Sequence, residues 1–533
     1  MAVYVPESFT ADEADVLRRY FTNLDGPVFA LVNLPEVVKG ALFARYSRSH
    51  KSLRRLFLDE FVGDLDVSGD HSVDATIGLA RAEELYERVF FDYGDDSVAQ
   101  LGGVHLACEQ ASNLLTKILE WGRLMSYLEQ STRYIAYDNR LGGRYRYYRD
   151  PAVLSSPLGT RYVGDLDRVF DAYSRSVDVA TEHVRSTVER GPDVSEFVYR
   201  TATRAKALDA VRGILPAAAT SNVGIYGTGQ AFEALLLRMR SNPLPEARDY
   251  ADLMLHELRK VIPSFLRRVD LPERGGRWSE YLATTRNDTA TLVSELFGST
   301  PVEPAAEVEL VDFDPEAEDK LLAAICYSHS TLPEHQLLDR VRQLGADERV
   351  SLIRAYVGDR ENRRHKPGRA FERSFYRFDV LSDYGAFRDM QRHRMLTIEW
   401  QRLTPNHGFT RPELVTEAGL GREFDDAMER SAGLYDALSN EFPQQASYAV
   451  SMAYRIRYAM QFNAREAIHM LELRSSPQGH PSYRRVALEM HRLIGEQAGH
   501  HAIAASMNHM TTEAPELERL EAERRAEARR DGA

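Results

Sequence analysis

The stretch VFALVNLPEVVKGALFARYSRS, from Val28 to Ser49, decides the fold because it recurs as VELVDFDPEAEDKLLAAICYSHS, from Val308 to Ser330. Each stretch begins with a β-like run, passes through a proline into an apolar segment typical of a helix, and ends at a Tyr-Ser pair. Internal repeats set the number of structural units in a chain. We therefore expect two tandem copies of one fold.

Further blocks match in the same order. The segment LLTKILEWGRLMSYLEQSTRY (Leu114–Tyr134) corresponds to YGAFRDMQRHRMLTIEWQRLTP (Tyr384–Pro405), which places Arg123 over Arg394. Each copy later reaches a helix that closes alike, as ALLLRMRSNP in the first copy and HMLELRSSP in the second. Chance similarity explains a single block but not an ordered series. The fold class expected is α+β, with a small sheet and long helices in each copy.

The blocks also set the expected domain boundaries. We expect an N-terminal extension over residues 1–25, with a short helix over Ala11–Phe21 that Ser8 or Thr10 caps. The first copy covers residues 26–299 and the second covers residues 308–512, joined by a Pro-rich stretch. Residues 513–533 form a charged tail, expected to be a solvated or frayed helix.

Between Tyr134 and Arg212 the first copy carries an insert that the second copy lacks, beginning with RLGGRYRYYRDPAVLSSPLGTRY. Its richness in tyrosine and arginine is typical of surfaces on which bases stack. A surface loop is the favoured interpretation.

Composition limits the classes of function. The chain has 533 residues and a formal net charge of −13, which argues against non-specific binding to nucleic acid or to an anionic membrane. The N-terminal residues lack the features of a signal peptide, and no apolar run reaches membrane-spanning length. Only two cysteines are present, so neither disulfides nor a cysteine metal site is expected. We expect a cytoplasmic protein.

The tripeptide Arg392-His393-Arg394 follows a segment of helical period, Tyr384 to Met390. Two guanidinium groups beside an imidazole can hold a planar anion or a phosphate. A solvated basic turn is the alternative for an isolated motif. The matching block in the first copy, which has Trp121-Gly122-Arg123 at this place, favours a binding role. No metal-ligand spacing surrounds the histidines, and no metal site is expected.

With these blocks the chain resembles the flavin-dependent thymidylate synthases. Their signature is an R-H-R motif followed by a Glu-x-Ser-x-Arg-Tyr segment, an Arg before Leu-Pro, an Asn-Ala-Arg that opens a helix and a Leu-x-Leu-Arg that closes it. The resemblance covers most of both copies and excludes the extension, the insert and the tail.

Carried over by position, the resemblance implies that the two copies are degenerate in complementary ways. The first copy keeps residues that the family assigns to the nucleotide: Glu129, Ser131, Arg133, Arg212 and Arg240. The second copy keeps residues on the flavin side: Glu372, Arg392, His393, Arg394, Asn463 and Arg465, with His469 as a further candidate. It also keeps Arg474, which the family places against the uracil ring. Arg474, Arg240 and Ser131 are the catalytic candidates.

The resemblance further implies that NADPH reduces FAD and that a methylene group passes from methylenetetrahydrofolate to C5 of dUMP. The family works as a homotetramer, so a tandem chain is expected to form a homodimer that acts as a pseudo-tetramer. Two alternatives stay open: a catalytically degenerate protein that binds flavin or nucleotide, and a C5-alkylating enzyme that acts on another pyrimidine nucleotide.

Overall fold

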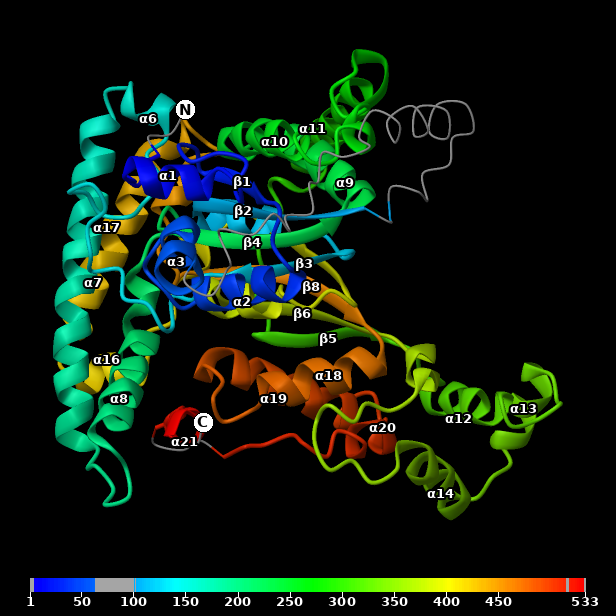
Figure 1. Ribbon diagram of the computed structural model, residues 1–533. Helices are drawn as coiled ribbons and strands as arrows, with labels where there is room; N and C mark the ends of the chain where they lie inside the picture. Colours follow the sequence, from blue (N-terminus) through cyan, green and yellow to red (C-terminus); the bar gives the residue numbers. More distant parts are fainter. Residues whose placement is uncertain (1–3, 63–99, 101, 514–516, 532–533) are drawn as a thin grey trace. The chain divides into compact units, whose positions relative to one another are not determined.

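The computed structural model describes residues 4–62, 100, 102–513 and 517–531. Its strands form two four-stranded antiparallel sheets with the same spatial order, β1-β2-β4-β3 and β5-β6-β8-β7 (Figure 1). The strands are β1 (Val28–Leu31), β2 (Gly103–Ser112), β3 (Met125–Glu129), β4 (Thr220–Thr228), β5 (Val308–Phe313), β6 (Tyr376–Asp383), β7 (Thr397–Trp400) and β8 (Arg455–Phe462). The prediction of two tandem copies of an α+β fold is confirmed.

The repeated stretch that led to this prediction forms the same unit twice. In the first copy β1 leads through Pro35 into α2 (Glu36–Tyr46), and in the second copy β5 leads into α12 (Ala317–Tyr327). All four residues of β1 are buried. A strand that is covered on both faces reads as a continuous apolar run, which explains why VFAL shows no alternation.

The chain divides into two compact units, and each unit takes a segment from the other copy. The first unit comprises Met1–Ser174, Leu215–Val302 and Glu429–Ser451; the second comprises Arg175–Ile214, Glu303–Met428 and Met452–Ala533. In the second unit, the Ala453 amide donates to the Gly213 carbonyl (2.9 Å), so the exchanged segment is hydrogen-bonded to its host. Arg212 of the first copy therefore belongs to the unit that holds the second sheet.

The first unit builds its core around the first sheet. Its helices include α1 (Ala11–Leu17), α3 (Leu53–Glu60), α5 (Asn113–Leu119), α6 (Pro151–Leu154), α9 (Gly229–Arg240), α10 (Pro245–Leu258) and α11 (Arg277–Phe297). The predicted helix in the N-terminal extension exists, with Thr10 as its cap in a capping box. It ends four residues earlier than expected, because Phe21 forms a β-bridge with Leu31.

The second unit covers its sheet with α18 (Ala464–Arg474) and α19 (Pro481–Glu496), which lie beside each other (Figure 1). The unit also contains α8 (Glu196–Val211), α13 (Glu334–Val341), α14 (Ala346–Val357), α15 (Tyr384–Met390), α16 (Glu413–Glu417), α20 (His501–Ala505) and α21 (Leu520–Asp531). Two helices, α7 (Gly159–Thr187) and α17 (Gly421–Ser439), divide their residues between the units.

One expectation from the sequence is wrong, and another holds only in part. The Tyr/Arg-rich start of the insert is not a surface loop, because Tyr145, Tyr147 and Tyr148 are buried, and most of the remaining insert is helical. The tail does form a helix, α21, whose described side chains after Leu520 are exposed or half-buried, but Leu517 ahead of it is buried and Arg519 forms an ion pair with Asp209 (2.8 Å). In both segments, side chains that are apolar or form ion pairs alternate closely with charged ones. The burial of these segments therefore cannot be recognised from the sequence pattern alone.

Within the described residues, the structure contains no helix that is both long and apolar enough to cross a membrane.

Candidate functional site

The second unit contains a pocket of about 340 Å³, which we call the cationic pocket. It is lined by Lys366, Glu372, Arg392, His393, Arg394, Met395, Asn463, Arg465, Glu466, His469, Leu473 and Arg474. All seven residues predicted for the cofactor lie in this lining, together with the catalytic candidate Arg474. The structure thus gathers into one pocket residues that are up to a hundred positions apart in sequence.

Two helix ends position these side chains. Asp383 caps α15 by accepting a hydrogen bond from the Ala386 amide (2.8 Å), and the R-H-R motif follows the end of that helix. Asn463 caps α18 by accepting from the Glu466 amide (2.9 Å), so the N-terminus of α18 lies at the pocket. The partial positive charge of a helix N-terminus favours an anion there.

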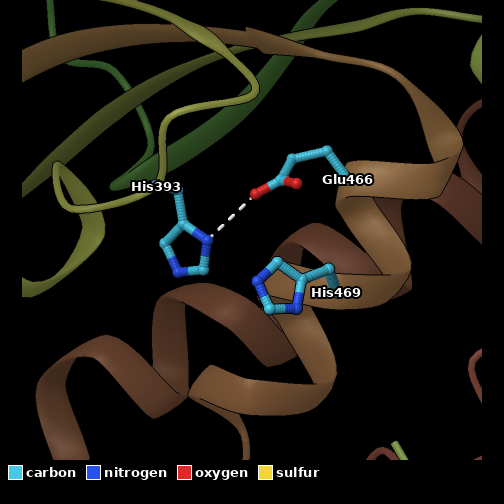
Figure 2. A group of neighbouring side chains, drawn as sticks. All are labelled: His393, Glu466 and His469. Atoms are coloured by element: carbon cyan, nitrogen blue, oxygen red, sulfur yellow. Dashed lines mark hydrogen bonds and ion pairs between the residues drawn. The ribbon is translucent and has the colours of Figure 1, made fainter. Parts of the chain in front are cut away.

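A buried chain of hydrogen bonds runs through the pocket wall. His393 Nδ1 lies 3.0 Å from Glu466 Oε1 (Figure 2). On the other side of the ring, Arg474 Nε donates to His393 Nε2 at 3.0 Å. Because the guanidinium can only donate, Nε2 is the acceptor and Nδ1 carries the proton that it donates to Glu466. His393 is therefore a neutral imidazole in a single tautomer, and it fixes the direction of the Arg474 side chain.

The titration of these groups follows from burial and from their cationic neighbours. Burial lowers the pKa of His393 well below its usual value, and the nearby Arg474 lowers it further. Burial, and to a smaller extent the positive charge of Lys366, lowers the pKa of His469 to about 4. Burial raises the pKa of Glu466 to about 7, although the surrounding cations act in the opposite direction. Near neutral pH both imidazoles are therefore uncharged, and the positive charge of the pocket comes from its lysine and arginine side chains.

Asp389 links the pocket to the segment exchanged from the first copy. Its carboxylate lies 3.5 Å from Arg212, 3.8 Å from Arg392 and 4.0 Å from Arg474. Arg212 and Asp389 are both buried. The predicted nucleotide-side residue Arg212 therefore lies near residues predicted for the flavin side, with one carboxylate held between three guanidinium groups.

The pocket carries a local excess of positive charge. Five cationic and two acidic side chains line it, an excess of three positive charges if both acids are ionised. One acid, Glu372, is already engaged, because it pairs with Arg465 (3.3 Å) and Arg369 (3.0 Å). In a chain with a net charge of −13, such a cluster concentrates an anionic ligand locally.

The pocket also contains a set of groups with the composition of a metal site. One ligand atom from each of His393, Glu466 and His469 lies within 4.8 Å of the others (Figure 2). Two histidines and a glutamate are a known ligand set for zinc. Here, however, both ring nitrogens of His393 already form hydrogen bonds, and Lys366 and Arg474 repel a cation at this place. The surrounding field favours an anion over a divalent metal ion.

The corresponding place in the first unit has a different chemistry. The Arg238 guanidinium carbon lies over the Trp121 ring, 5.7 Å from the centre of that ring. A Cβ atom at Gly122 would lie 2.5 Å from the Tyr127 hydroxyl, so a side chain such as that of His393 does not fit without displacing Tyr127. At the N-terminus of α9 the cap is Thr228, which puts Gln230 at the position of Arg465.

The predicted nucleotide-side residues of the first unit lie in separate environments. Glu129 is buried and pairs with Lys117 (3.1 Å), which also pairs with the buried Glu120. Arg240 pairs with Asp252 (2.6 Å) near the surface. Ser131 and Arg133 share a turn in which the Arg133 amide donates to the Ser131 hydroxyl (3.3 Å). Ser131 and Arg133 are thus joined by a hydrogen bond, whereas Arg212 belongs to the second unit.

Sequence reasoning missed three residues that shape the cationic pocket: Lys366, Asp389 and Glu466. Glu466 carried a signal, since residues three apart on a helix share a face and Glu466 precedes His469 by three positions. Asp389 lies one turn before the R-H-R motif and could have been found in the same way. Lys366 lies outside the matched blocks, and the sequence contains no pattern that places it here.

Comparison with known proteins identifies the class to which this fold and pocket belong. Residues 44–264 and 309–498 match the model of the family described as thymidylate synthase complementing protein. The chain belongs to this family, which is the flavin-dependent thymidylate synthase family that its motifs resemble.

Full-length relatives are known. The chain is 39% identical to a UPF0159 protein of Chlamydia muridarum, covering 90% of this chain and 92% of the relative. It is 38% identical to a UPF0159 protein of Chlamydia pneumoniae, covering 92% and 93%, and 30% identical to one of Thermoplasma acidophilum, covering 93% and 99%. A crystal structure of a UMP/dUMP methylase PolB from Streptomyces cacaoi bound with 5-Br dUMP matches 37% of this chain and 94% of its own, with 21% identity and a TM-score of 0.29.

Proposed function

We propose that the protein is a flavin-dependent thymidylate synthase-like enzyme, which transfers a methylene group from methylenetetrahydrofolate to C5 of dUMP with FAD reduced by NADPH. The observation that carries the proposal is the cationic pocket, in which every predicted flavin-side residue of the second copy converges. Family membership supplies the expected chemistry, and the pocket supplies a place for the cofactor.

The donor chemistry of the pocket fits FAD. The diphosphate of FAD needs several cationic donors, and Arg392, Arg394 and Arg465 lie in the lining beside the N-terminus of α18. Met395 and Leu473 add apolar surface for a ring system. A volume of about 340 Å³ lies at the lower end of the range of ordinary ligand sites. When bound, FAD supplies the redox chemistry that the side chains cannot provide.

Arg474 is the residue to which we assign electrostatic stabilisation of the pyrimidine. Negative charge develops on the ring when C5 reacts, and a preorganised guanidinium stabilises that charge. His393 accepts from Nε of Arg474, which leaves the two terminal nitrogens to point elsewhere, and one of them lies 4.0 Å from Asp389. The hydrogen bond to His393 therefore reduces the rotational freedom that Arg474 would lose on binding substrate.

We further propose that the site is divided between the copies. Domain boundaries at residues 26–299 and 308–512 put Ser131, Arg133 and Arg212 in the first copy and the R-H-R motif in the second. Arg212 supports this division, since it belongs to the unit of the second copy and lies beside Asp389. A homodimer that acts as a pseudo-tetramer is part of the same proposal.

The test begins with the visible spectrum of the purified protein and the ratio of flavin to chain. We expect one FAD per chain, and release of the C5 hydrogen from labelled dUMP when NADPH and methylenetetrahydrofolate are added. Arg133→Ala should weaken dUMP binding and leave the flavin content unchanged. A colourless protein that gains no flavin on reconstitution would contradict the proposal, as would loss of flavin from the Arg133 variant.

One observation favours a second candidate, a non-catalytic protein that binds flavin. Glu129 of the predicted nucleotide side is buried against Lys117, and Arg212 is paired with Asp389. Groups that are already paired within the protein are less available to a nucleotide. Flavin binding without hydrogen release from dUMP, from UMP or from another pyrimidine nucleotide would support this candidate; release from a nucleotide other than dUMP would instead identify a related C5-alkylating enzyme.

A further inference from the structure

The first unit carries a long helix that packs against it along only part of its length, α11 (Arg277–Phe297). None of its 21 residues is buried, and it lies beside α9 (Figure 1). Its half-buried residues share one face of the N-terminal half: Ser279, Leu282, Ala283 and Arg286. Every residue from Asn287 to Phe297 is exposed. The described residues of the chain therefore provide no packing for the C-terminal half of α11.

A stripe of apolar and threonine residues runs along α11 beside the face that packs on the unit. Its positions alternate steps of four and three residues, the spacing by which one helix packs along another. They are Trp278, Leu282, Thr285, Thr289, Leu292 and Leu296, with Tyr281, Val293 and Phe297 at the borders. The six large side chains other than Leu282 are each between 49% and 62% exposed. We call this surface the apolar stripe.

The apolar stripe has the size of a protein contact. At about 200 Å² for an aromatic side chain, its three aromatic residues alone expose roughly 350 Å². Monomeric proteins rarely expose a contiguous apolar patch of more than a few hundred Å². A standard interface takes about 800 Å² from each partner, and the aliphatic and threonine residues of the stripe bring α11 toward that area. Because short helices are marginal in water without packing, a partner would also stabilise the C-terminal half of α11.

The apolar stripe is complementary to itself. About a centre at Asn287, each large apolar residue of one half has an apolar counterpart at the same distance in the other half. The matched positions are Trp278 with Leu296, Tyr281 with Val293, and Leu282 with Leu292. Two copies of α11 that lie antiparallel therefore place apolar side chains opposite each other at both ends of the stripe. Contacts of this kind, in which one surface meets itself, are those of two-fold symmetric dimers.

Two charged residues beside the stripe fit the same arrangement. Arg277 and Glu295 lie on the same side of the helix, 18 positions apart, which is about 27 Å along its axis. They cannot meet within one helix, and neither forms an ion pair with another described residue. In the antiparallel arrangement, Arg277 of one copy lies within two positions of the point opposite Glu295 of the other. The two-fold axis then gives two ion pairs between the copies.

We propose that α11 forms a contact between two copies of this chain, in which the apolar stripes of the two helices pack antiparallel. The helix lies between the two segments that match the family model, so this surface is an addition to the family fold. The contact specifies a surface for the homodimer of the proposed function. It involves no residue assigned there to flavin or to nucleotide.

The test is sedimentation equilibrium of the full chain, which measures the dissociation constant of the dimer. Leu292→Glu should raise this constant at least 100-fold, because the two-fold axis introduces each substitution twice at the centre of an apolar contact. Glu280→Arg, on the opposite side of the same helix, is the matched control and should change it less than twofold. Unaltered thermal unfolding of each variant checks that the fold is retained.

Charge exchange tests the antiparallel direction. Arg277→Glu and Glu295→Arg should each raise the dissociation constant about tenfold, because each breaks two ion pairs and adds two repulsive ones. The double variant should return it to within about threefold of the parent value, because both pairs are rebuilt with the charges exchanged. Asp288→Asn should lower the constant, since the two Asp288 carboxylates lie close to the two-fold axis and repel each other.

Four results would overturn the proposal: a parent chain that stays monomeric up to about 100 μM, a Leu292→Glu variant that dimerises as the parent does, a double charge variant no tighter than the single ones, or a weaker dimer in Asp288→Asn. Flavin absorbance of the same samples separates this proposal from the proposed function. A flavin-loaded protein whose dimer is unaffected by Leu292→Glu contradicts only the α11 contact. A colourless protein that dimerises through α11 contradicts only the proposed function.

Discussion

Trp121 and Gly122 of the first copy stand where the second copy has Arg392 and His393, and in both copies the preceding helix has seven residues. In the second unit this place opens into a pocket with an excess of cations. In the first unit the Tyr127 hydroxyl occupies the space beside Gly122. The same backbone frame thus supports either a ligand site or a closed surface, and the side chains at two positions decide between them.

The two units also differ in how they treat buried charge. In the first unit Lys117 pairs with both Glu120 and Glu129, so this buried cluster carries no excess of positive charge. In the second unit a single carboxylate, Asp389, lies among three guanidinium groups, which leaves positive charge for an anionic ligand. Two copies of one fold can therefore come to differ in what they attract. The second unit keeps an excess of positive charge that can hold an anion, and the first unit does not.

The largest effect expected from this comparison is on catalysis. Arg474→Gln should lower the rate of C5-hydrogen release by about 100- to 1,000-fold, the usual cost of removing a preorganised donor from a developing charge. Arg240→Gln, at the matching helix end of the first copy, should change the rate less than twofold, because Arg240 is paired with Asp252 near the surface. Steady-state rates at saturating dUMP provide the measurement. Equal losses in the two variants would show that the copies are not divided in this way.

The next effect concerns stability and pH. Burial raises the pKa of Glu466 to about 7 from an ordinary value of 4.5. Its folded form therefore holds the proton more tightly than the unfolded form, so its contribution to stability is present below about pH 4.5 and is lost as the pH rises through 7. Relative to Glu466→Gln, the parent protein should lose about 3 kcal/mol of unfolding free energy between pH 4.5 and 8.

Chemical denaturation at several pH values measures this loss. Glu246 of the first unit is also buried, and its pKa is likewise raised to about 7. Glu246→Gln is therefore the matched control. It removes the pH-dependent stability that Glu246 contributes and leaves the contribution of Glu466 unchanged. A difference between the parent and Glu466→Gln that stays constant with pH would contradict the assignment.

The smallest effect tests the closed place in the first unit. Gly122→Ala should destabilise the protein by about 1 kcal/mol, because the new methyl group meets the Tyr127 hydroxyl. The cost should largely disappear in the Tyr127→Phe background, where that hydroxyl is absent. Denaturation midpoints of the two single variants and the double variant form the necessary cycle. If the two substitutions add without coupling, the hydroxyl is not what closes this place.

Much of the fold could be predicted from the sequence, for a local reason. The two β-proline-helix stretches and the helix after Asn463 each express their structure through hydrogen bonds and apolar spacing within about twenty residues. Such patterns are readable in one dimension. The predicted flavin-side residues came from the family resemblance, which could be recognised because it is carried by short motifs at helix ends.

What could not be predicted depends on contacts between distant segments. The exchange that places Arg212 beside Asp389 leaves no trace in either segment, because each reads as an ordinary helix end. In the insert, the buried Tyr148 ring packs against that of Tyr448, with ring centres 5.0 Å apart, three hundred positions later in the sequence. The hydrogen bond from Arg474 to His393 joins residues 81 positions apart. Charged and aromatic residues in such segments look solvated until their partners are known.

The division between the copies is tested most directly by one pair of variants at matching positions, Arg394→Ala and Arg123→Ala. Both arginines are exposed and occupy matching positions within the repeated block, but of the two only Arg394 lines the cationic pocket. The flavin absorbance per chain should fall by at least tenfold in Arg394→Ala and stay at the parent value in Arg123→Ala. Flavin loss in the Arg123 variant, or full flavin content in the Arg394 variant, would contradict the account.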